Sequence, residues 1–195
     1  MNVAVDFILR FLLRQNVIEN GEDSIAYCRY GIEITISSLF NVLLIIIIGL
    51  LFGLVIDSIV FLVIFINMRR YTGGYHASTY LRCNTTLCIS FTALCFIMKA
   101  IIISDYYLVL FLTVLIHILS FCIIVIFSPL ENENKPLTDN LKRINHIKSI
   151  VFSVTAAIVN LILLSFHIIR SVMIALTVLL VAILMIIKIV KEGKA

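Results

Sequence analysis

The sequence predicts an all-α protein, a polytopic transmembrane helix bundle, and three observations lead to this prediction. Hydrophobic residues make up 62% of the 195 residues, with a mean hydropathy of +1.16, whereas soluble domains are about half apolar. Charged residues make up only 13% of the chain. About six segments are apolar over lengths that approach the roughly 20 residues a helix needs to cross the hydrocarbon core.

Six apolar segments are expected to form the bundle. They are Ile34–Phe52, Leu54–Asn67, Leu87–Ile103, Tyr106–Phe127, Ile150–Ile169 and Val172–Ile187. The second is the shortest, so it is either a short span or one half of a re-entrant hairpin. Six full spans, and four spans with two interfacial or re-entrant segments, both fit this pattern.

Residues 1–33 are expected to form an amphipathic and juxtamembrane region. Asp6, Arg10 and Arg14 recur every four residues, which places them in one polar stripe on a helix. A helix with a broad apolar remainder lies at the membrane surface or packs on the bundle with its polar stripe in water. The sequence fits both arrangements.

We expect one integral membrane domain over residues 1–195, with two polar loops at residues 68–86 and 128–149. If both termini are cytoplasmic, all but two of the 15 Lys and Arg residues face the cytoplasm, the exceptions being Lys99 and Arg170. Basic residues gather on the cytoplasmic side of membrane proteins. We therefore predict a multi-pass protein of the cell membrane whose termini and both polar loops are cytoplasmic, and the four-span arrangement has the same sidedness.

The loop at 68–86 holds the pair best suited to catalysis, His76 and Cys83. A thiolate is the reactive form of cysteine, and a neighbouring imidazole favours it. The base must lie about 3 Å from the proton that it takes, or act through one water. Seven residues of continuous helix would separate the two Cα atoms by about 10 Å, so a catalytic pair requires the chain to bend between them.

Gly73 and Gly74, the only glycine pair in the chain, precede His76 and make such a bend plausible. The same segment also has a reading without catalysis, in which its arginines only anchor the topology, the histidine is interfacial and Cys83 is a passive thiol. A metal site formed by His76, Cys83 and Cys88 is not favoured, because the spacing fits no common zinc pattern. We expect no metal and no cofactor.

The run from Arg69 to Cys83, RRYTGGYHASTYLRC, resembles the signature of the accessory gene regulator B (AgrB) family of membrane peptidases. The later polar run SPLENENKPL, which begins at Ser128, resembles the second hydrophilic loop of that family. The resemblance covers essentially the whole chain. It implies that His76 and Cys83 are the catalytic pair of a cysteine endopeptidase with a histidine general base.

The resemblance also implies a substrate, an AgrD-like quorum-sensing propeptide with an acidic C-terminal tail. The enzyme would remove the tail and cyclise the signal peptide through an acyl-enzyme thioester. Arg69, Arg70 and Arg82 are the expected contacts of the tail, and Gly73 and Gly74 would shape the site. A homodimer in the lipid bilayer is implied, and no nucleic acid partner is expected.

The main alternative is a membrane protein without enzymatic activity that exports or scaffolds a small peptide, with its basic loops as the docking surface. A small-solute transporter is not favoured, because the sequence has no repeat symmetry and no paired broken helices. Among the polar residues inside the apolar segments, His117 and His167 are expected to be hydrogen-bonded within the bundle, and Asn41 and Asn160 to join helices through hydrogen bonds.

Overall fold

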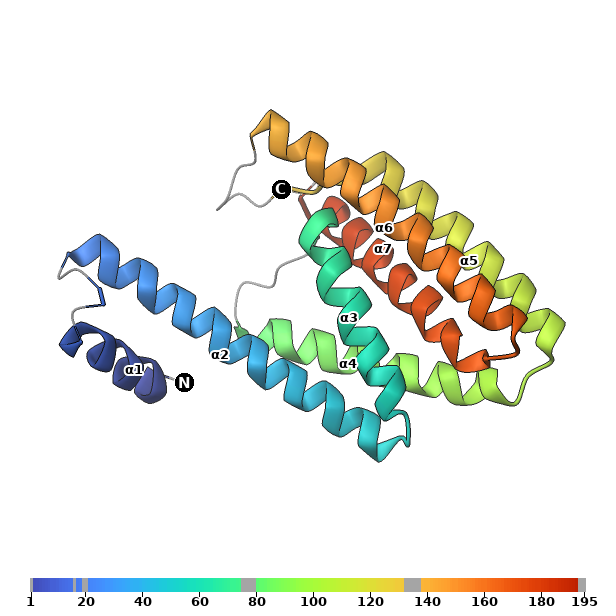
Figure 1. Cartoon of the computed structure of the whole chain (residues 1–195), viewed down its shortest axis with the longest axis horizontal. Coiled ribbons are helices and arrows are strands. Elements are labelled where there is room, and N and C mark those ends of the chain that lie inside the picture. The colour runs from blue at the N-terminus through green and yellow to red at the C-terminus, as the bar shows by residue number, and fades with distance from the viewer. Residues whose placement is uncertain (1, 16, 19–20, 75–79, 132–137, 193–195) are drawn as a thin grey trace. The chain divides into compact units, whose positions relative to one another are not determined.

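The computed structural model of the chain describes residues 2–15, 17–18, 21–74, 80–131 and 138–192. These residues form helices and no strand. The elements are α1 (Asn2–Arg14), α2 (Glu22–Leu51), α3 (Val55–Thr72), α4 (Tyr80–Ile102), α5 (Tyr106–Phe127), α6 (Asp139–Ser165), the 3-10 turn η1 (Ile169–Ser171) and α7 (Val172–Glu192) (Figure 1). The chain divides into two compact units, Met1–Leu44 and Ile45–Ala195, which are described in turn.

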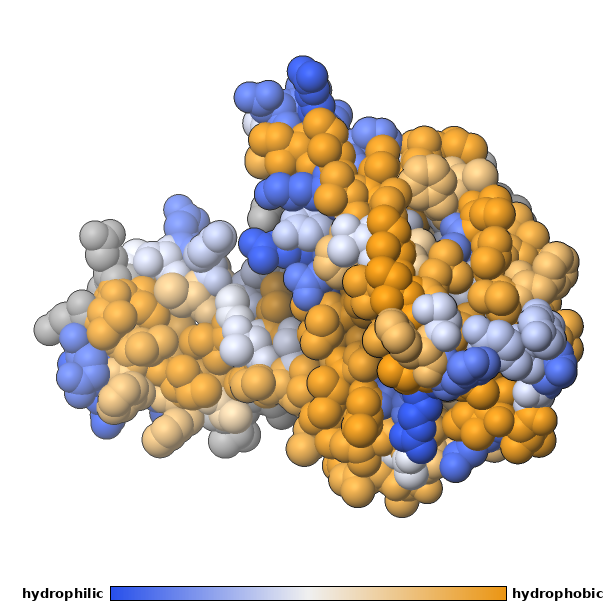
Figure 2. Space-filling view, turned by 45° about the vertical axis from the view of Figure 1, so that its right-hand side comes forward, coloured by the Kyte–Doolittle hydropathy of each residue, from blue (hydrophilic) through white to orange (hydrophobic). Residues whose placement is uncertain are grey.

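Five of the described helices, α2, α4, α5, α6 and α7, are long and apolar enough to cross a membrane. The remaining predicted segment, α3, carries Asp57, Arg69 and Arg70 in its 18 residues. Large apolar side chains are exposed along these helices, including Phe111, Leu115 and Ile118 of α5. Figure 2 shows a surface that is hydrophobic over most of the visible face. The predicted helical, polytopic membrane fold is therefore confirmed.

In the first unit, α1 contacts the beginning of α2 through its polar stripe. Asp6 accepts a hydrogen bond from the guanidinium of Arg29 at 2.6 Å, and both side chains are partly exposed. Val5 and Leu9 of α1 are buried, whereas Phe7 is largely exposed. Part of the predicted polar stripe thus pairs with protein, and apolar side chains of α1 such as Phe7 are left uncovered by the rest of this unit.

The helix bounds agree best with the prediction where polar residues cap an apolar run. The predicted segment 106–127 coincides with α5. The Asp105 side chain caps this helix by accepting hydrogen bonds from the backbone N–H groups of Tyr107 and Leu108. At the other end, the chain leaves the helix at Ser128, immediately before Pro129.

The two polar loops are shorter than predicted. Residues 68–72 belong to α3 and residues 80–86 to α4, while α6 begins at Asp139, well inside the predicted loop 128–149. Helix α2 likewise begins at Glu22 rather than Ile34. The reason is that an apolar stretch marks only the part of a helix that can lie in the hydrocarbon core. The helix itself continues into the polar residues on either side.

The second unit is built around α7, which contacts α3, α4, α5 and α6. Of the most apolar 18-residue stretch of this span, 72% is buried, far more than in the other candidate spans. Helix α7 is therefore the core helix of this unit. In Figure 1 it runs beside α6, with α3 on its other side. The expected interhelical contact of His117 is confirmed: its Nε2 lies 2.9 Å from Oδ1 of Asn160, whose amide donates to Ser171.

The ends of α3 and α5 meet through their backbones. Gly73 follows α3 with a φ of +69°, and Leu130 follows α5. The N–H of Leu130 donates to the carbonyl of Thr72 at 2.9 Å, and Gly73 and Leu130 form an isolated parallel bridge. A Cβ atom at position 73 would overlap the carbonyl oxygen of Leu130. The close approach of these two segments therefore requires glycine at this position.

Side chains from α6 and α7 join the same junction. His146 donates from Nδ1 to the carbonyl of Ser128 at 2.6 Å, and the hydroxyls of Ser128 and Ser149 lie 2.7 Å apart. Lys188 of α7 donates to the backbone carbonyl of Glu131. The C-terminal ends of α3, α5 and α7 and the N-terminal end of α6 thus meet at one end of the second unit.

The opposite end of the second unit has its own polar contacts. Asp57, which is 1% exposed, pairs with the half-exposed Arg170 at 3.3 Å. The hydroxyl of Tyr106 donates to the carbonyl of Leu164 at 3.0 Å. Arg170 and Lys99, the two residues predicted to face outward, both lie toward this end. The other described Lys and Arg residues of the unit lie in the last turns of α3 and α7, in the first three turns of α6 and, for Arg82, in the first turn of α4.

Replacing Gly73 with Ala should lower the stability of the protein by about 1–3 kcal/mol or more, because the new side chain is strained at a positive φ and also meets the Leu130 carbonyl. Gly53→Ala is the matched control, because Gly53 has a similar φ of +66° with open space around its Cβ position. Thermal unfolding in detergent micelles measures the difference. Equal losses for the two variants would contradict a tight junction at Gly73.

Candidate active site

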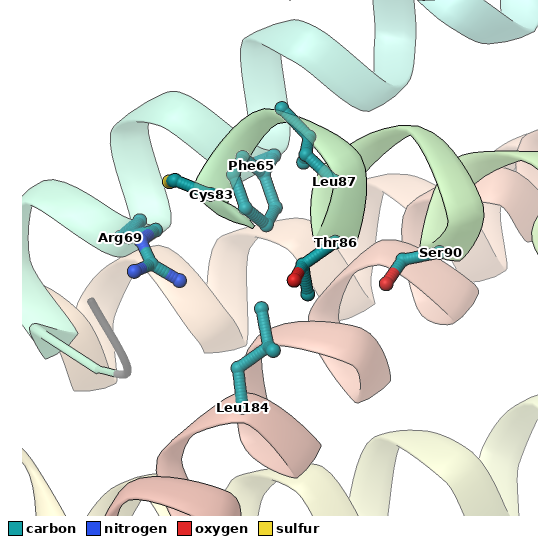
Figure 3. Close-up of a pocket in the computed structure, with 7 residues that line it drawn as sticks. All are labelled: Phe65, Arg69, Cys83, Thr86, Leu87, Ser90 and Leu184. Atoms are coloured by element: carbon teal, nitrogen blue, oxygen red, sulfur yellow. The ribbon is translucent and has the colours of Figure 1, made fainter. Parts of the chain in front are cut away.

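Cys83 lies in the first turn of α4 and lines a cavity together with Arg69 from the last turn of α3. Its side chain is half-buried. Figure 3 shows the sulfur directed from α4 toward the turn of α3 that carries Arg69. The predicted base, His76, lies outside the described residues. The described site is therefore the nucleophile and its surroundings.

A small cavity of about 50 Å³ lies beside Cys83. Its α4 wall is formed by Cys83, Thr86, Leu87 and Ser90, which share one helix face because the last three follow Cys83 by three, four and seven positions. The cavity is completed by Phe65 and Arg69 of α3 and Leu184 of α7. The lining is mostly apolar, with two hydroxyl groups and one cation. It suits a single apolar side chain held next to the sulfur.

Arg69 is the charged group of this cavity. It lies in the last turn of α3, where a basic side chain is favoured by the helix dipole. Burial lowers the pKa of the Arg69 guanidinium, and the charge of the nearby Cys83 sulfur raises it. Guanidinium groups nevertheless stay protonated in proteins, so Cys83 has a cation beside it. The side chain also stacks on Phe65, with Cζ 5.6 Å from the ring centroid.

The glycine pair shapes the chain on the α3 side of the site. Gly73 makes the backbone junction with Leu130 described above. Gly74 has a φ of +132°, which favours glycine, and a Cβ atom there would lie 3.7 Å from Nη1 of Arg69. The two glycines thus allow the backbone that follows α3 to approach Leu130 and to pass next to the Arg69 guanidinium.

A larger groove of about 750 Å³ adjoins the Cys83 cavity and shares Phe65 and Arg69 with it. Its walls are the last turns of α3, the Gly73–Gly74 pair, Pro129 and Leu130, and the first turns of α6.

Arg70 is exposed and lines this groove. Arg82 is exposed on α4 and lines neither cavity. The three arginines predicted to bind substrate are therefore divided between different surfaces.

Several lining residues were not foreseen. The spacing of Cys83, Leu87 and Ser90 on a helix was a usable signal, because residues three or four apart share a face. The contributions of Leu184 and Lys148 come from helices far away in the sequence. No local sequence pattern identifies these two residues as lining residues, because tertiary packing decides which helices come together.

Comparison with known proteins identifies relatives. Residues 5–189 match the family described as Accessory gene regulator B. An AgrB-like protein of Clostridium perfringens strain SM101 is 26% identical over 117 residues, which cover 59% of this chain and 55% of that protein. The FsrB protein of Enterococcus faecalis is 28% identical over 97 residues, which cover 50% of this chain and 40% of that protein.

The match therefore spans about half the length of the curated relatives. No solved structure is significantly similar to the chain. Because the family match extends over nearly all of the chain, from the first helix to the last, the resemblance noted in the polar segments is confirmed. The chain belongs to the accessory gene regulator B family.

Proposed function

We propose that the protein is a membrane-embedded cysteine endopeptidase that cleaves the C-terminal tail from an AgrD-like quorum-sensing propeptide and cyclises the signal peptide. The observation that carries the proposal is the position of Cys83, half-buried at a cavity beside the Arg69 guanidinium. A neighbouring cation stabilises the negative charge that a sulfur carries when it attacks carbonyl carbon. Membership of the AgrB family supports the same chemistry.

The first step forms the acyl-enzyme. His76 takes the proton of the Cys83 thiol, and the thiolate attacks the carbonyl carbon of the peptide bond before the tail. The imidazolium then donates that proton to the leaving amine, the C–N bond breaks, and a thioester to Cys83 remains. For this step the imidazole must come within hydrogen-bond reach of the sulfur, directly or through one water.

The second step closes the ring. A Cys or Ser side chain of the bound peptide gives its proton to His76 and attacks the thioester carbonyl, and Cys83 leaves as a thiolate. Exchange of one thioester for another is nearly balanced in energy, so water must be kept out to prevent hydrolysis. The apolar lining of the cavity, with Phe65, Leu87 and Leu184, suits this requirement.

The remaining features of the proposal concern the setting of the enzyme. We propose that both termini and the site face the cytoplasm, where a newly made precursor is available. The clustering of described basic residues at the site end of the second unit supports this sidedness. We also propose that the protein acts as a homodimer, as the family resemblance implies.

Removing either member of the catalytic pair should abolish tail release. Cys83→Ala and His76→Ala are each expected to lower the rate of cleavage by about a thousandfold or more, because each removes an essential group. The measurement is precursor cleavage by protein reconstituted in liposomes. Cys88→Ala, which changes a thiol on α4 outside the cavity lining, is the control and should cleave normally. Normal cleavage by Cys83→Ala would favour an exporter or scaffold instead.

Arg69 should set the reactivity of Cys83. Arg69→Gln is expected to slow alkylation of Cys83 by iodoacetamide by about tenfold, because negative charge on the attacking sulfur loses its neighbouring cation. Mass spectrometry of the peptide that contains Cys83 gives the rate. Arg69→Lys keeps the charge and should retain most of the reactivity. Arg70→Gln, on the adjoining groove, should leave it unchanged, and an equal effect of Arg70→Gln would refute a specific role for Arg69.

A further inference from the structure

Asp57 is a buried carboxylate in the first turn of α3. Its side chain is 1% exposed, and no other acidic residue whose burial the structure describes is buried. A carboxylate in the protein interior is costly unless its charge is paired, and even a paired one is often no more stabilising than apolar side chains of similar volume. The position of Asp57 is therefore explained better by what it orients than by stability alone.

Two cations from other helices act on Asp57. Arg170 lies in η1, immediately before α7, and its Nη1 donates to Oδ2 of Asp57 at 3.3 Å. Lys99 lies in the last turn of α4, and its charge also stabilises the carboxylate. The first turn of a helix favours an acidic side chain as well. One carboxylate thus links the beginning of α3 to the start of α7 and to the end of α4.

The helices that Asp57 links are also the helices that line the Cys83 cavity, to which α3 contributes Arg69 and α7 contributes Leu184. Arg69 follows Asp57 by 12 positions, which is about 18 Å of helix. Leu184 follows Arg170 by 14 positions, which is about 21 Å. Helices α3 and α7 pack together and run in the same direction from the ion pair (Figure 1). The pair therefore sets which part of α3 lies beside which part of α7 at the cavity.

A row of buried side chains connects Asp57 to the cavity along α3. Asp57, Phe61 and Phe65 are four residues apart and share the buried face of the helix. The ring of Phe61 stacks on Phe65, with centroids 5.2 Å apart, and packs on Phe91 of α4 at 4.7 Å. Phe65 lines the cavity, and the guanidinium of Arg69 lies over its ring. Closely packed side chains transmit a displacement, so a shift of α3 at its first turn moves the cation of the site.

We propose that Asp57 is a positioning residue of the active site. Its pair with Arg170 fixes the position of α3 along α7, and this position places Arg69 beside Cys83. A single buried polar residue fixes the register of packed helices in coiled coils in the same way. The proposal rests on the proposed function only for its effect on cleavage, because the reactivity of the Cys83 thiol reports the same geometry without a substrate. Asp57 itself does not line the cavity.

Alkylation of Cys83 by iodoacetamide, measured on the full-length chain in detergent micelles, tests the proposal. Asp57→Ala should slow this reaction by about threefold or more, because α3 loses its fixed position and the Arg69 cation moves away from the sulfur. Cys88, which lies outside the cavity lining, should react at an unchanged rate. A fold that is merely loosened would instead speed the alkylation of both thiols.

Ser58→Ala is the matched control. Ser58 is a buried polar residue in the same turn of α3, but its hydroxyl donates within that helix, to the carbonyl of Val55. Its truncation should leave the alkylation rate of Cys83 unchanged. An equal effect of Ser58→Ala, or a normal rate in Asp57→Ala, would overturn the proposal.

Coupling between Asp57 and Arg69 is the sharper readout. In the double variant Asp57→Ala/Arg69→Gln, alkylation of Cys83 should be no slower than in Arg69→Gln alone, because the cation that Asp57 positions is already absent. If the two effects multiply in full, Asp57 acts independently of Arg69 and the proposal is wrong.

Arg170 provides the same test from the other side of the pair. Arg170→Gln should slow alkylation of Cys83 as Asp57→Ala does, whereas Arg170→Lys, which keeps the charge, should retain most of the rate. This comparison carries the test if Asp57→Ala does not fold, because Arg170 is half-exposed and tolerates substitution better. Equal rates for the two Arg170 variants would contradict the proposal.

The cleavage assay separates this proposal from the proposed function. Asp57→Ala should lower kcat for the precursor by about threefold or more and leave KM nearly unchanged, because the change acts on the charge of the attacking sulfur. Lower thermal stability with normal kcat and normal alkylation would reduce the pair to a stabilising contact and refute the proposal. If wild type does not cleave but the alkylation rates are coupled as described, the positioning role of Asp57 stands and the peptidase function fails.

Discussion

The backbone contact between Gly73 and Leu130 is the constraint on which the site depends. It joins the segment after α3 to the segment after α5, two parts of the chain that are far apart in sequence, with no side chain between them. Arg69 belongs to the last turn of α3, so its position beside Cys83 follows from where α3 ends. The groove between α3 and α6 exists for the same reason, because Pro129 and Leu130 form part of its wall.

The interactions around this junction have different strengths and roles. The buried hydroxyls of Ser128 and Ser149 are hydrogen-bonded to each other, and the half-buried imidazole of His146 donates to the carbonyl of Ser128. Loss of either hydroxyl would leave a buried polar group unpaired. The ion pair between Glu131 and Lys142 is half-exposed and contributes little to stability. Its effect is instead electrostatic, because it neutralises a carboxylate that directly follows Leu130 of the groove wall. The junction therefore combines a rigid backbone with a surface that stays positive.

Much of the fold could be predicted from the sequence, because each apolar stretch reports a helix that suits lipid. The prediction for α5 coincides with the observed bounds, since Asp105 and Ser128 mark both ends of an unbroken apolar run. The predictions for α2 and α6 began too late, because both helices extend through polar residues that the apolar pattern does not detect.

The site is harder to predict. Cys83 stood out by its chemistry and its motif, whereas Leu184 and Lys148 depend on which helices pack together, and local sequence does not encode that choice.

The central claim is that Cys83 carries the acyl group between cleavage and ring closure. It is tested most directly with a precursor whose own cyclising nucleophile is replaced by Ala, so that the second step cannot occur. Intact-mass measurement of wild-type protein should then show one added acyl segment, which maps to Cys83 and is removed by hydroxylamine. Release of the tail with no covalent adduct, or an adduct on a cysteine other than Cys83, would contradict the account.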